Sequence, residues 1–283
     1  NTTADNNTAV GALALDANTT GGDNTALGVS ALRQNTTADG NTAIGRGALT
    51  ANTTGTRNVA VGAHALDNSS TTGDNTAVGY NAMSASTTGD RNVAVGTYAL
   101  DAGTTASNCI AIGYNSLTAN TTGNSNTAIG VASLESNTTG TQNTAIGSAA
   151  LENNTTGSYN IAVGRLALSA NTTTNNNTAV GYAAMQSNTT GTENTAVGKS
   201  ALNAGTTGSY NTAVGTGAMQ AGTVTGNKND AFGFNAGHNI STGTSNTCIG
   251  TQTMDSLTTG NYNVAIGVAA LQAITDDSNN VAV

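Results

Sequence analysis

Residues 41–57 read NTAIGRGALTANTTGTR, and this 17-residue unit recurs along the chain. Its opening pentad, Asn-Thr-Ala-Ile/Val-Gly, returns at a constant spacing, apart from one extra residue before Asn229. We number the unit from position 1, at this Asn, to position 17, just before the next one. A fixed period of this length is typical of a solenoid, in which each repeat forms one coil and stacks on its neighbour.

The composition fits a thin, repetitive fold. The 283 residues are 3% aromatic and 8% charged, with neither Pro nor Trp. Because large apolar side chains are scarce, only a narrow core of small residues can form in each coil. A net charge of −8 without a basic run argues against nucleic acid as a partner, and no apolar stretch is long enough to predict a membrane span.

Comparing the copies predicts the local structure. Position 4 is always apolar and position 2 is usually Thr, Val or Ile, a pattern that indicates a strand. Position 9 is nearly always Leu or Met beside a polar position 10, which predicts a second strand with position 9 facing inward. Gly at positions 5 and 15, as at Gly45 and Gly55, is expected at the two corners. We therefore predict an all-β fold, a β-solenoid of the parallel β-roll type, with 17-residue coils and two short strands per coil.

The two ends of the sequence and one irregular coil indicate how the chain is organised. The chain starts and stops inside repeats, without atypical capping copies, so residues 1–283 are expected to be an internal window of one longer solenoid. Residues 222–238 hold the extra residue and both Phe residues, Phe232 and Phe234. We expect either a bulge filled by the two rings, where Gly237 replaces the usual Leu, or a ligand-binding patch.

The strand pattern also favours more than one chain. Position 3 is Ala in every coil except at Cys248, and position 8 is always small. Since positions 3 and 4 face opposite sides of a strand, one set is expected to line the coil interior and the other a seam with neighbouring chains. The sequence leaves both assignments open. The alanines that we consider for the seam are Ala9, Ala26, Ala43, Ala128 and Ala145.

A resemblance adds to this reading. The pattern of residues 41–48, NTAIGRGA, resembles the head repeat of YadA-type trimeric autotransporter adhesins and of related phage and viral tail-fibre shafts, and it covers essentially the whole chain. The resemblance implies a left-handed coil in a homotrimer that projects from a cell or virion surface and binds matrix or host. The present coil is longer and adds an Asn-Thr-Thr-Gly segment.

Position 13 is Thr or Ser in every complete coil. If position 12 packs inward, position 13 faces outward, where folding alone would also accept Lys, Glu or Gln. We therefore predict a functional hydroxyl column, either a site for O-linked sugars or a flat binding face. Its members are Thr19, Thr36, Thr53, Ser70, Thr87, Thr104, Thr121, Thr138, Thr155, Thr172, Thr189, Thr206, Thr223, Ser241, Thr258 and Thr275.

Position 12 offers a second modification hypothesis. Asn followed by Thr-Thr forms an N-glycosylation sequon in several coils. The same position is Ile240, Leu257 and Ile274 in later coils, which favours an inward Asn ladder over N-glycans. The candidate asparagines are Asn18, Asn35, Asn52, Asn120, Asn137, Asn154, Asn171 and Asn188.

Catalytic chemistry is not expected. His64 and His238 lie ten coils apart, and Cys109 and Cys248 lie eight coils apart, too far for a triad, a metal cluster or a disulfide. We predict no catalytic, cofactor-binding or metal-binding residues and no enzyme activity.

The tyrosines fall mainly on outward positions 6 and 17. They are interpreted as surface residues, with stacking on sugars as the alternative. They are Tyr80, Tyr114, Tyr159, Tyr182, Tyr210 and Tyr262.

These features predict a structural shaft of an extracellular fibre or surface adhesin, with itself, glycans or a host surface as partners. The alternative is a binding module, either an adhesin head or a face of Thr columns that binds ice or polysaccharide.

Overall fold

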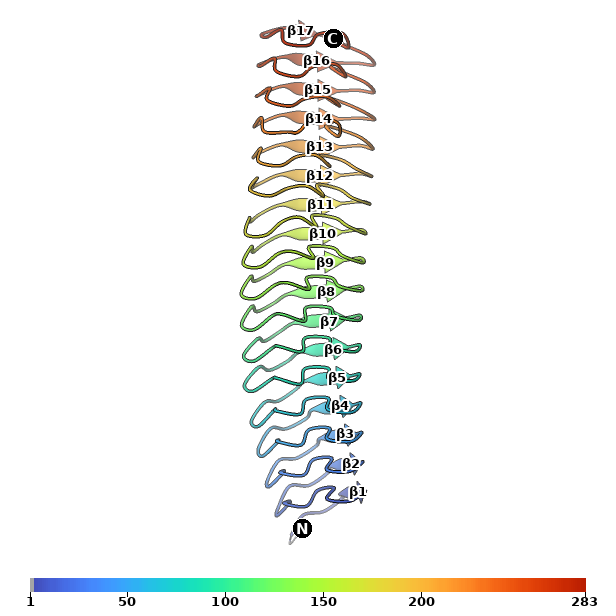
Figure 1. Cartoon of the computed structure of the whole chain (residues 1–283), viewed down its shortest axis with the longest axis vertical. Helices are drawn as coiled ribbons and strands as arrows, with labels where there is room; N and C mark the ends of the chain where they lie inside the picture. The colour runs from blue at the N-terminus through green and yellow to red at the C-terminus, as the bar shows by residue number, and fades with distance from the viewer. Residues whose placement is uncertain (1–2) are drawn as a thin grey trace. The chain divides into compact units, whose positions relative to one another are not determined.

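The structure, a computed structural model, describes residues 3–283 and comprises two compact units, Asn1–Gln142 and Asn143–Val283. Each unit is a β-solenoid, which confirms the predicted fold class, and the described residues contain no helix. In unit 1, β1 to β8 follow one another up the stack (Figure 1). Their bounds are Thr8–Val10, Thr25–Leu27, Thr42–Ile44, Val59–Val61, Thr76–Val78, Val93–Val95, Ile110–Ile112 and Thr127–Ile129.

Unit 2 repeats this arrangement with β9 to β17. Their bounds are Thr144–Ile146, Ile161–Val163, Thr178–Val180, Thr195–Val197, Thr212–Val214, Asp230–Phe232, Thr247–Ile249, Val264–Ile266 and Val281–Ala282. Inside each unit every strand pairs in parallel with the strand of the next coil, and like positions face each other, as Ala43 faces Ala60. The constant repeat length produces this register, since one coil brings each residue above its own equivalent.

Each coil has one strand rather than the predicted two. The stretch around position 9 consists of turns, because residues at positions 7 and 9 have φ near +50° to +60°, as at Tyr98 (58°) and Leu100 (52°). Position 17, just before the next strand, has the same conformation, as at Arg91 (58°). Backbone bonds still join the coils there, for example Leu100 N–H to Ser116 O at 3.0 Å. Position 9 does face inward as predicted, and Leu100 is fully buried.

Glycine occurs at the two predicted corners for two different reasons. At position 5 the backbone has positive φ, as at Gly181 (136°), and an added Cβ would lie 2.4 Å from the carbonyl oxygen of Gly198 in the next coil. At position 15, Gly55 does not have a left-handed φ, but an added Cβ would lie 2.1 Å from Thr72 O. Close stacking, rather than backbone freedom, therefore accounts for glycine at that second corner.

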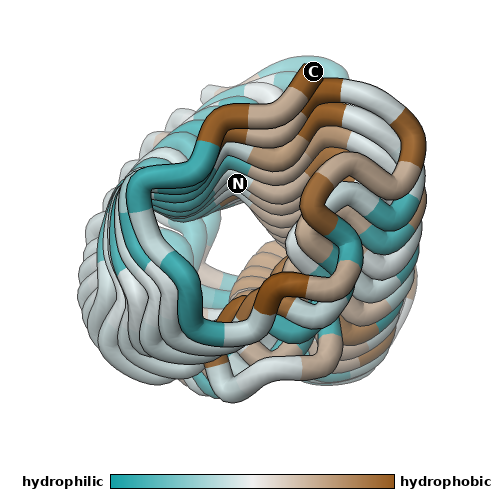
Figure 2. The backbone as a smooth tube through the Cα atoms, turned by 90° about the horizontal axis from the view of Figure 1, so that it is seen from above, coloured by the Kyte–Doolittle hydropathy of each residue, from teal (hydrophilic) through white to brown (hydrophobic). Residues whose placement is uncertain are grey.

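The interior has an apolar side and a polar side. Positions 3, 8 and 9 bury Ala and Leu or Met, whereas positions 1 and 12 bury asparagines. In each unit, residues of similar hydropathy recur at the same place around successive coils (Figure 2). Asn24 and Asn35 show that the two polar positions are neighbours, since both donate to Ala38 O, at 2.8 and 3.0 Å. A large part of the core is thus a hydrogen-bonded network.

Candidate binding surfaces

The structure offers surfaces rather than a cavity. Residues 3–283 form no pocket, and they contain no group of three or more His, Cys, Asp or Glu side chains that could hold a metal ion. The same residues include no helix with the length and apolarity to cross a bilayer. His64 lies 2.9 Å from Asp67 and His238 lies 3.8 Å from Asp255, so each histidine pairs with a single carboxylate. The candidate sites are therefore exposed rows of side chains.

The outer face of the sheet is the most regular of these rows. In the strands the middle residue is buried, while positions 2 and 4 on either side are half-buried or exposed. Position 4 is apolar in every coil, and its exposed fraction is, for example, 37% at Ile112 and 39% at Ile249. Position 2 carries Thr, Val or Ile except at Asp230. We call the row formed by positions 2 and 4 the outer sheet face.

The alanines considered for the seam lie on the opposite side of the strands. Ala26, Ala43, Ala128 and Ala145 have no exposed surface, because they fill the interior of their own coils. Ala9, in the first coil, is exposed. The assignment of these alanines to a seam between chains is therefore wrong, and a seam along the sheet would have to use positions 2 and 4.

The hydroxyl column at position 13 has a role in folding. The hydroxyl of Thr104 donates to Thr121 O at 3.1 Å, and that of Thr258 donates to Thr275 O at 2.9 Å. Equivalent bonds from one coil to the next recur in both units. The premise that folding needs no hydroxyl here is wrong, because Lys, Glu or Gln could not make this short bond. The recurrence of Thr at position 13 consequently no longer indicates sugar attachment.

One predicted member of the column is displaced. Val224 is buried, and Thr225 makes the backbone bond typical of position 13, from its N–H to Ser241 O at 2.8 Å. Thr223 is exposed beside this shifted register. The extra residue thus divides the role of position 13 between two residues, since Val224 O accepts the bond from Thr206 N–H at 3.2 Å while Thr225 N–H donates to the next coil, and Thr223 takes neither part.

The asparagines of the position 12 sequons form a buried ladder, as the inward alternative predicted. Asn171 donates through Nδ2 to Asn154 Oδ1 at 2.8 Å, and Asn137 to Asn120 Oδ1 at 2.8 Å. All eight candidate asparagines, Asn18, Asn35, Asn52, Asn120, Asn137, Asn154, Asn171 and Asn188, are at most 2% exposed. Because Nδ2 is the atom that would carry the sugar, the folded coil cannot hold N-glycans there.

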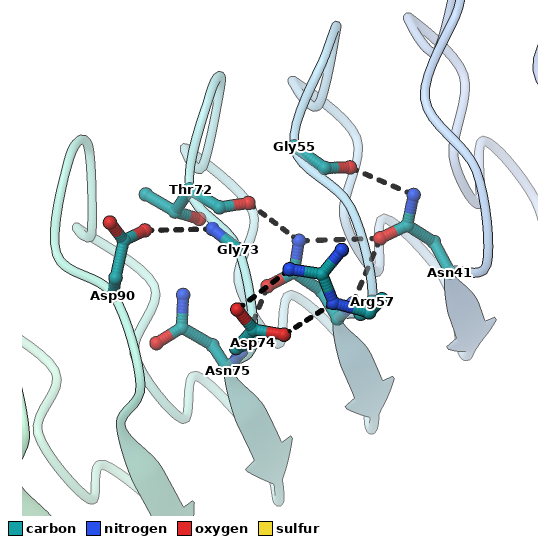
Figure 3. Close-up of polar contacts among 9 residues, drawn as sticks. Asn41, Gly55, Arg57, Thr72, Gly73, Asp74, Asn75 and Asp90 are labelled. Atoms are coloured by element: carbon teal, nitrogen blue, oxygen red, sulfur yellow. Dashed lines mark hydrogen bonds and ion pairs between the residues drawn. The ribbon is translucent and has the colours of Figure 1, made fainter.

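A second ladder, at position 1, was not predicted. The backbone N–H of Asn58 donates to Asn41 Oδ1 at 2.9 Å, and Asn58 Nδ2 donates to Thr72 O at 2.7 Å. Asn41 Nδ2 donates in the same way to Gly55 O at 2.9 Å (Figure 3). Each Asn thereby satisfies one backbone donor and one backbone acceptor that the sheet leaves over. The near-invariance of Asn at this position, between two corners of the coil, was the signal in the sequence.

Charged residues on the outer corner mainly bond to other residues of the chain, as Arg57, Asp74 and Asp90 show. Arg57 makes two hydrogen bonds to Asp74, at 2.6 and 2.9 Å (Figure 3). These bonds hold the pKa of Asp74 below its usual value. Both side chains are exposed, so the pair contributes little to stability. Nearby, Asp90 accepts a bond from the backbone N–H of Gly73 at 2.8 Å and serves as a cap between coils.

The irregular coil does not contain rings that fill a bulge. Phe232 and Phe234 face outward, with 40% and 51% of their surface exposed. The space left by Gly237 is taken by Ile240 and Cys248, whose atoms lie 2.8 and 3.3 Å from a Cβ placed on Gly237. The filled-bulge interpretation is therefore wrong, and the two rings extend the outer surface of this coil.

Three tyrosines are brought together in unit 1. Tyr98 lies between Tyr80 and Tyr114, with ring centroids 5.6 and 6.5 Å away and nearly perpendicular planes. Elsewhere Tyr182 lies under Arg165, whose guanidinium carbon is 5.9 Å from the ring centroid. The sequence spacing of Tyr80 and Tyr114 did not reveal this cluster, because Tyr98 occupies position 7 rather than 6.

No protein-family model and no curated protein sequence matches this chain.

Proposed function

We propose that this chain is a non-catalytic structural segment of an extracellular or surface-borne fibre, whose copies associate through the outer sheet face. The observation that carries the proposal is the outward position 4, which is apolar in every coil although it is half-exposed. A coil on its own needs its inward residues to be apolar, but it gains nothing from a water-facing Ile or Val that Thr would not also supply.

Exposed apolar rows of this extent usually mark an interface. Soluble monomers rarely expose continuous apolar patches larger than a few hundred Å². Specific interfaces bury about 800 Å² on each partner, an area that branched side chains repeated over several coils can supply. Only Asp230 places a charge in the strands of this face, so its desolvation would cost little.

A second copy of the chain is the partner that fits the spacing. Coils repeat every ~4.8 Å, the separation of paired strands. A partner that meets the face at every coil must present side chains at the same interval, and another copy of this solenoid does so without further adaptation. The resemblance to trimeric adhesin and tail-fibre repeats agrees with such self-association.

The test compares two triple variants of the same three coils. Val78→Glu, Val95→Glu and Ile112→Glu place charges on the outer sheet face, whereas Thr88→Glu, Thr105→Glu and Thr122→Glu place equal charges on exposed position 14. We expect the unmodified protein and the Thr variant to sediment as the same oligomer and the outer-face variant to dissociate, with circular dichroism unchanged. A monodisperse monomer for the unmodified protein would refute the proposal.

The second candidate is a binding module, either an adhesin head or a face that binds ice or polysaccharide. It is favoured by the in-register threonines at position 2, such as Thr178 and Thr195, which form a regular row beside the apolar one. Thermal hysteresis and ice-recrystallisation assays test its ice-binding form. Activity that Thr178→Lys and Thr195→Lys remove would support this candidate over the shaft.

A further inference from the structure

The tyrosine cluster of unit 1 differs from the other aromatic residues of the chain. Of the seven tyrosines, Tyr98 contacts both Tyr80 and Tyr114, and the three come from three successive coils. Tyr80 and Tyr114 both occupy position 6 and expose 47% and 52% of their surface. Tyr98 lies between them at position 7, with its ring nearly perpendicular to theirs. The exposed rings of Tyr80 and Tyr114 thus form an aromatic cluster that is held together by Tyr98.

The fold does not require an aromatic residue at position 7. The φ of 58° at Tyr98 lies in the left-handed region, and Asn81, Ala132 and Leu166 have φ of 53°, 57° and 61° at the same position of other coils. Because residues of such different size adopt this backbone, folding alone does not account for the tyrosine at this place.

Polar side chains lie in the same coils as the rings. Asp101 lies close enough to Tyr98 to contribute to raising the pKa of its hydroxyl, after the larger effects of desolvation and of Tyr80, and it accepts a hydrogen bond from Ser84. Asn115, which follows Tyr114 in the sequence, donates through Nδ2 to Glu135 Oε1 at 3.0 Å. Aromatic faces bordered by carboxylates and carboxamides provide both stacking surfaces and hydrogen-bonding groups.

We propose that the cluster of Tyr80, Tyr98 and Tyr114 binds a neutral, β-1,4-linked polysaccharide laid along the stack of coils. The C–H faces of pyranose rings pack on tyrosine, and sugar hydroxyls can bond to Asp101, Asn81 and Asn115. Tyr80 and Tyr114 are two coils apart, about 9.6 Å along the stack at the spacing of paired strands. This separation matches one disaccharide of an extended β-1,4 chain. Acidic polysaccharides are disfavoured by the nearby carboxylates and by the net charge of −8.

The proposal goes beyond the structural role, because it assigns a ligand to a surface that is separate from the outer sheet face. A fibre that carries such a platform would hold a neutral polysaccharide while its sheet face remains engaged with other copies. The two ideas can fail independently, since the oligomeric state reports on one and sugar affinity on the other.

Isothermal titration with cellohexaose and chitohexaose tests the proposal, with a hexamer of galacturonic acid as the acidic probe. At least one neutral hexamer should bind, and the acidic one should bind at least about tenfold more weakly. Tyr80→Ala and Tyr114→Ala should each weaken binding about tenfold. Tyr98→Asn, which suits the backbone of position 7, should weaken it similarly while the coil stays folded.

Tyr182→Ala is the matched control, because Tyr182 also occupies position 6 and is also 47% exposed but lies outside the cluster. Its affinity for the neutral hexamer should be that of the unmodified protein. Absence of binding to both neutral hexamers, or an equal loss in the Tyr182 variant, would overturn the proposal. All four variants should keep the oligomeric state of the parent protein.

Discussion

At the scale of single residues, the buried asparagines determine in which coils every buried polar atom has a hydrogen-bond partner. The position 12 ladder of unit 1 is interrupted after Asn52, because Ser69 and Ser86 take the place of Asn. Asn52 Oδ1 is buried and has no hydrogen-bond donor, and Ser86 Oγ is likewise unsatisfied. An unsatisfied buried acceptor costs about 1–3 kcal/mol, so this break is a local weakness of unit 1.

Ser69→Asn is therefore expected to stabilise unit 1 by about 1 kcal/mol, since the new Nδ2 can donate to Asn52 Oδ1. Thr72 at position 15 is compatible with this change, because Asn171 and Thr174 already coexist in the same arrangement in unit 2. Urea unfolding measures the gain. Ser136→Asn is the control, because position 11 carries Asn in other coils, as at Asn68 and Asn153, and lies outside the ladder. Equal effects of the two substitutions would contradict the ladder explanation.

Cys248 makes stability sensitive to alkaline pH. Burial raises the pKa of this thiol to about 12, whereas the pKa of a cysteine in the unfolded chain is about 8.5. The unfolded chain therefore loses its proton first as the pH rises, so the folded state loses stability above about pH 8.5 at up to about 1.4 kcal/mol per pH unit. Below that pH the thiol makes no pH-dependent contribution.

Between pH 8 and pH 10.5 the free energy of unfolding should fall by about 2–3 kcal/mol more in the parent protein than in Cys248→Ala. Alanine is the residue that other coils carry at this position, so the variant keeps the packing. Urea titrations at several pH values measure the difference, in which other titrating groups cancel. Parallel pH profiles would show that the thiol is accessible to water in the folded state.

At the scale of the coil, glycine is required at position 5 for two reasons, its positive φ and the close approach of the next coil. Gly250 has φ of 133°, and an added Cβ would lie 2.4 Å from Gly267 O, whereas Gly40, at position 17, also has a positive φ (67°) and only an Arg57 side-chain carbon near its Cβ position, at 3.8 Å. Gly40→Ala should lose about 1–2 kcal/mol from backbone strain alone. Gly250→Ala should lose at least about 2 kcal/mol more, because the next coil must also move away.

Chemical unfolding of both variants separates strain from stacking. If the two losses are equal, the space between successive position 5 glycines is not limiting, and coils could separate locally without a large penalty.

The coil also shows how far the sequence can predict structure. The period, the strand at positions 2 to 4, the inward Leu of position 9 and the ladder at position 12 follow from the pattern of residues. The second strand did not follow, because Leu100 and its equivalents have positive φ, for which leucine gives no local signal. The seam assignment was wrong because Ala and Val both suit either side of a strand, and only the curvature of the closed coil places Ala43 inside. The tyrosine cluster needed a contact between positions 6 and 7 of different coils, which spacing along one column does not show.

At the scale of the whole molecule, two adjacent residues allow folding to be tested separately from the proposed association. Ala128 is fully buried in its coil, while its neighbour Ile129 belongs to the outer sheet face. Ala128→Glu should cost at least about 3 kcal/mol, because it buries an unpaired charge in a space made for a methyl group. Ile129→Glu should leave the urea midpoint of isolated subunits almost unchanged and weaken only their association.

Sedimentation and urea unfolding of both variants, compared with the parent protein, check this division. A large loss of stability in the Ile129 variant would place that side chain in the core and would remove the basis of the proposed interface.

The in-register pairing of each strand with its equivalent in the next coil has a consequence for how such a gene can change. Removing or duplicating one 17-residue repeat inside a unit leaves every remaining strand opposite a partner of the same kind. Unequal recombination between neighbouring repeats would therefore alter the copy number without creating a new type of contact. Such a change would lengthen or shorten a unit while leaving the fold of each remaining coil the same.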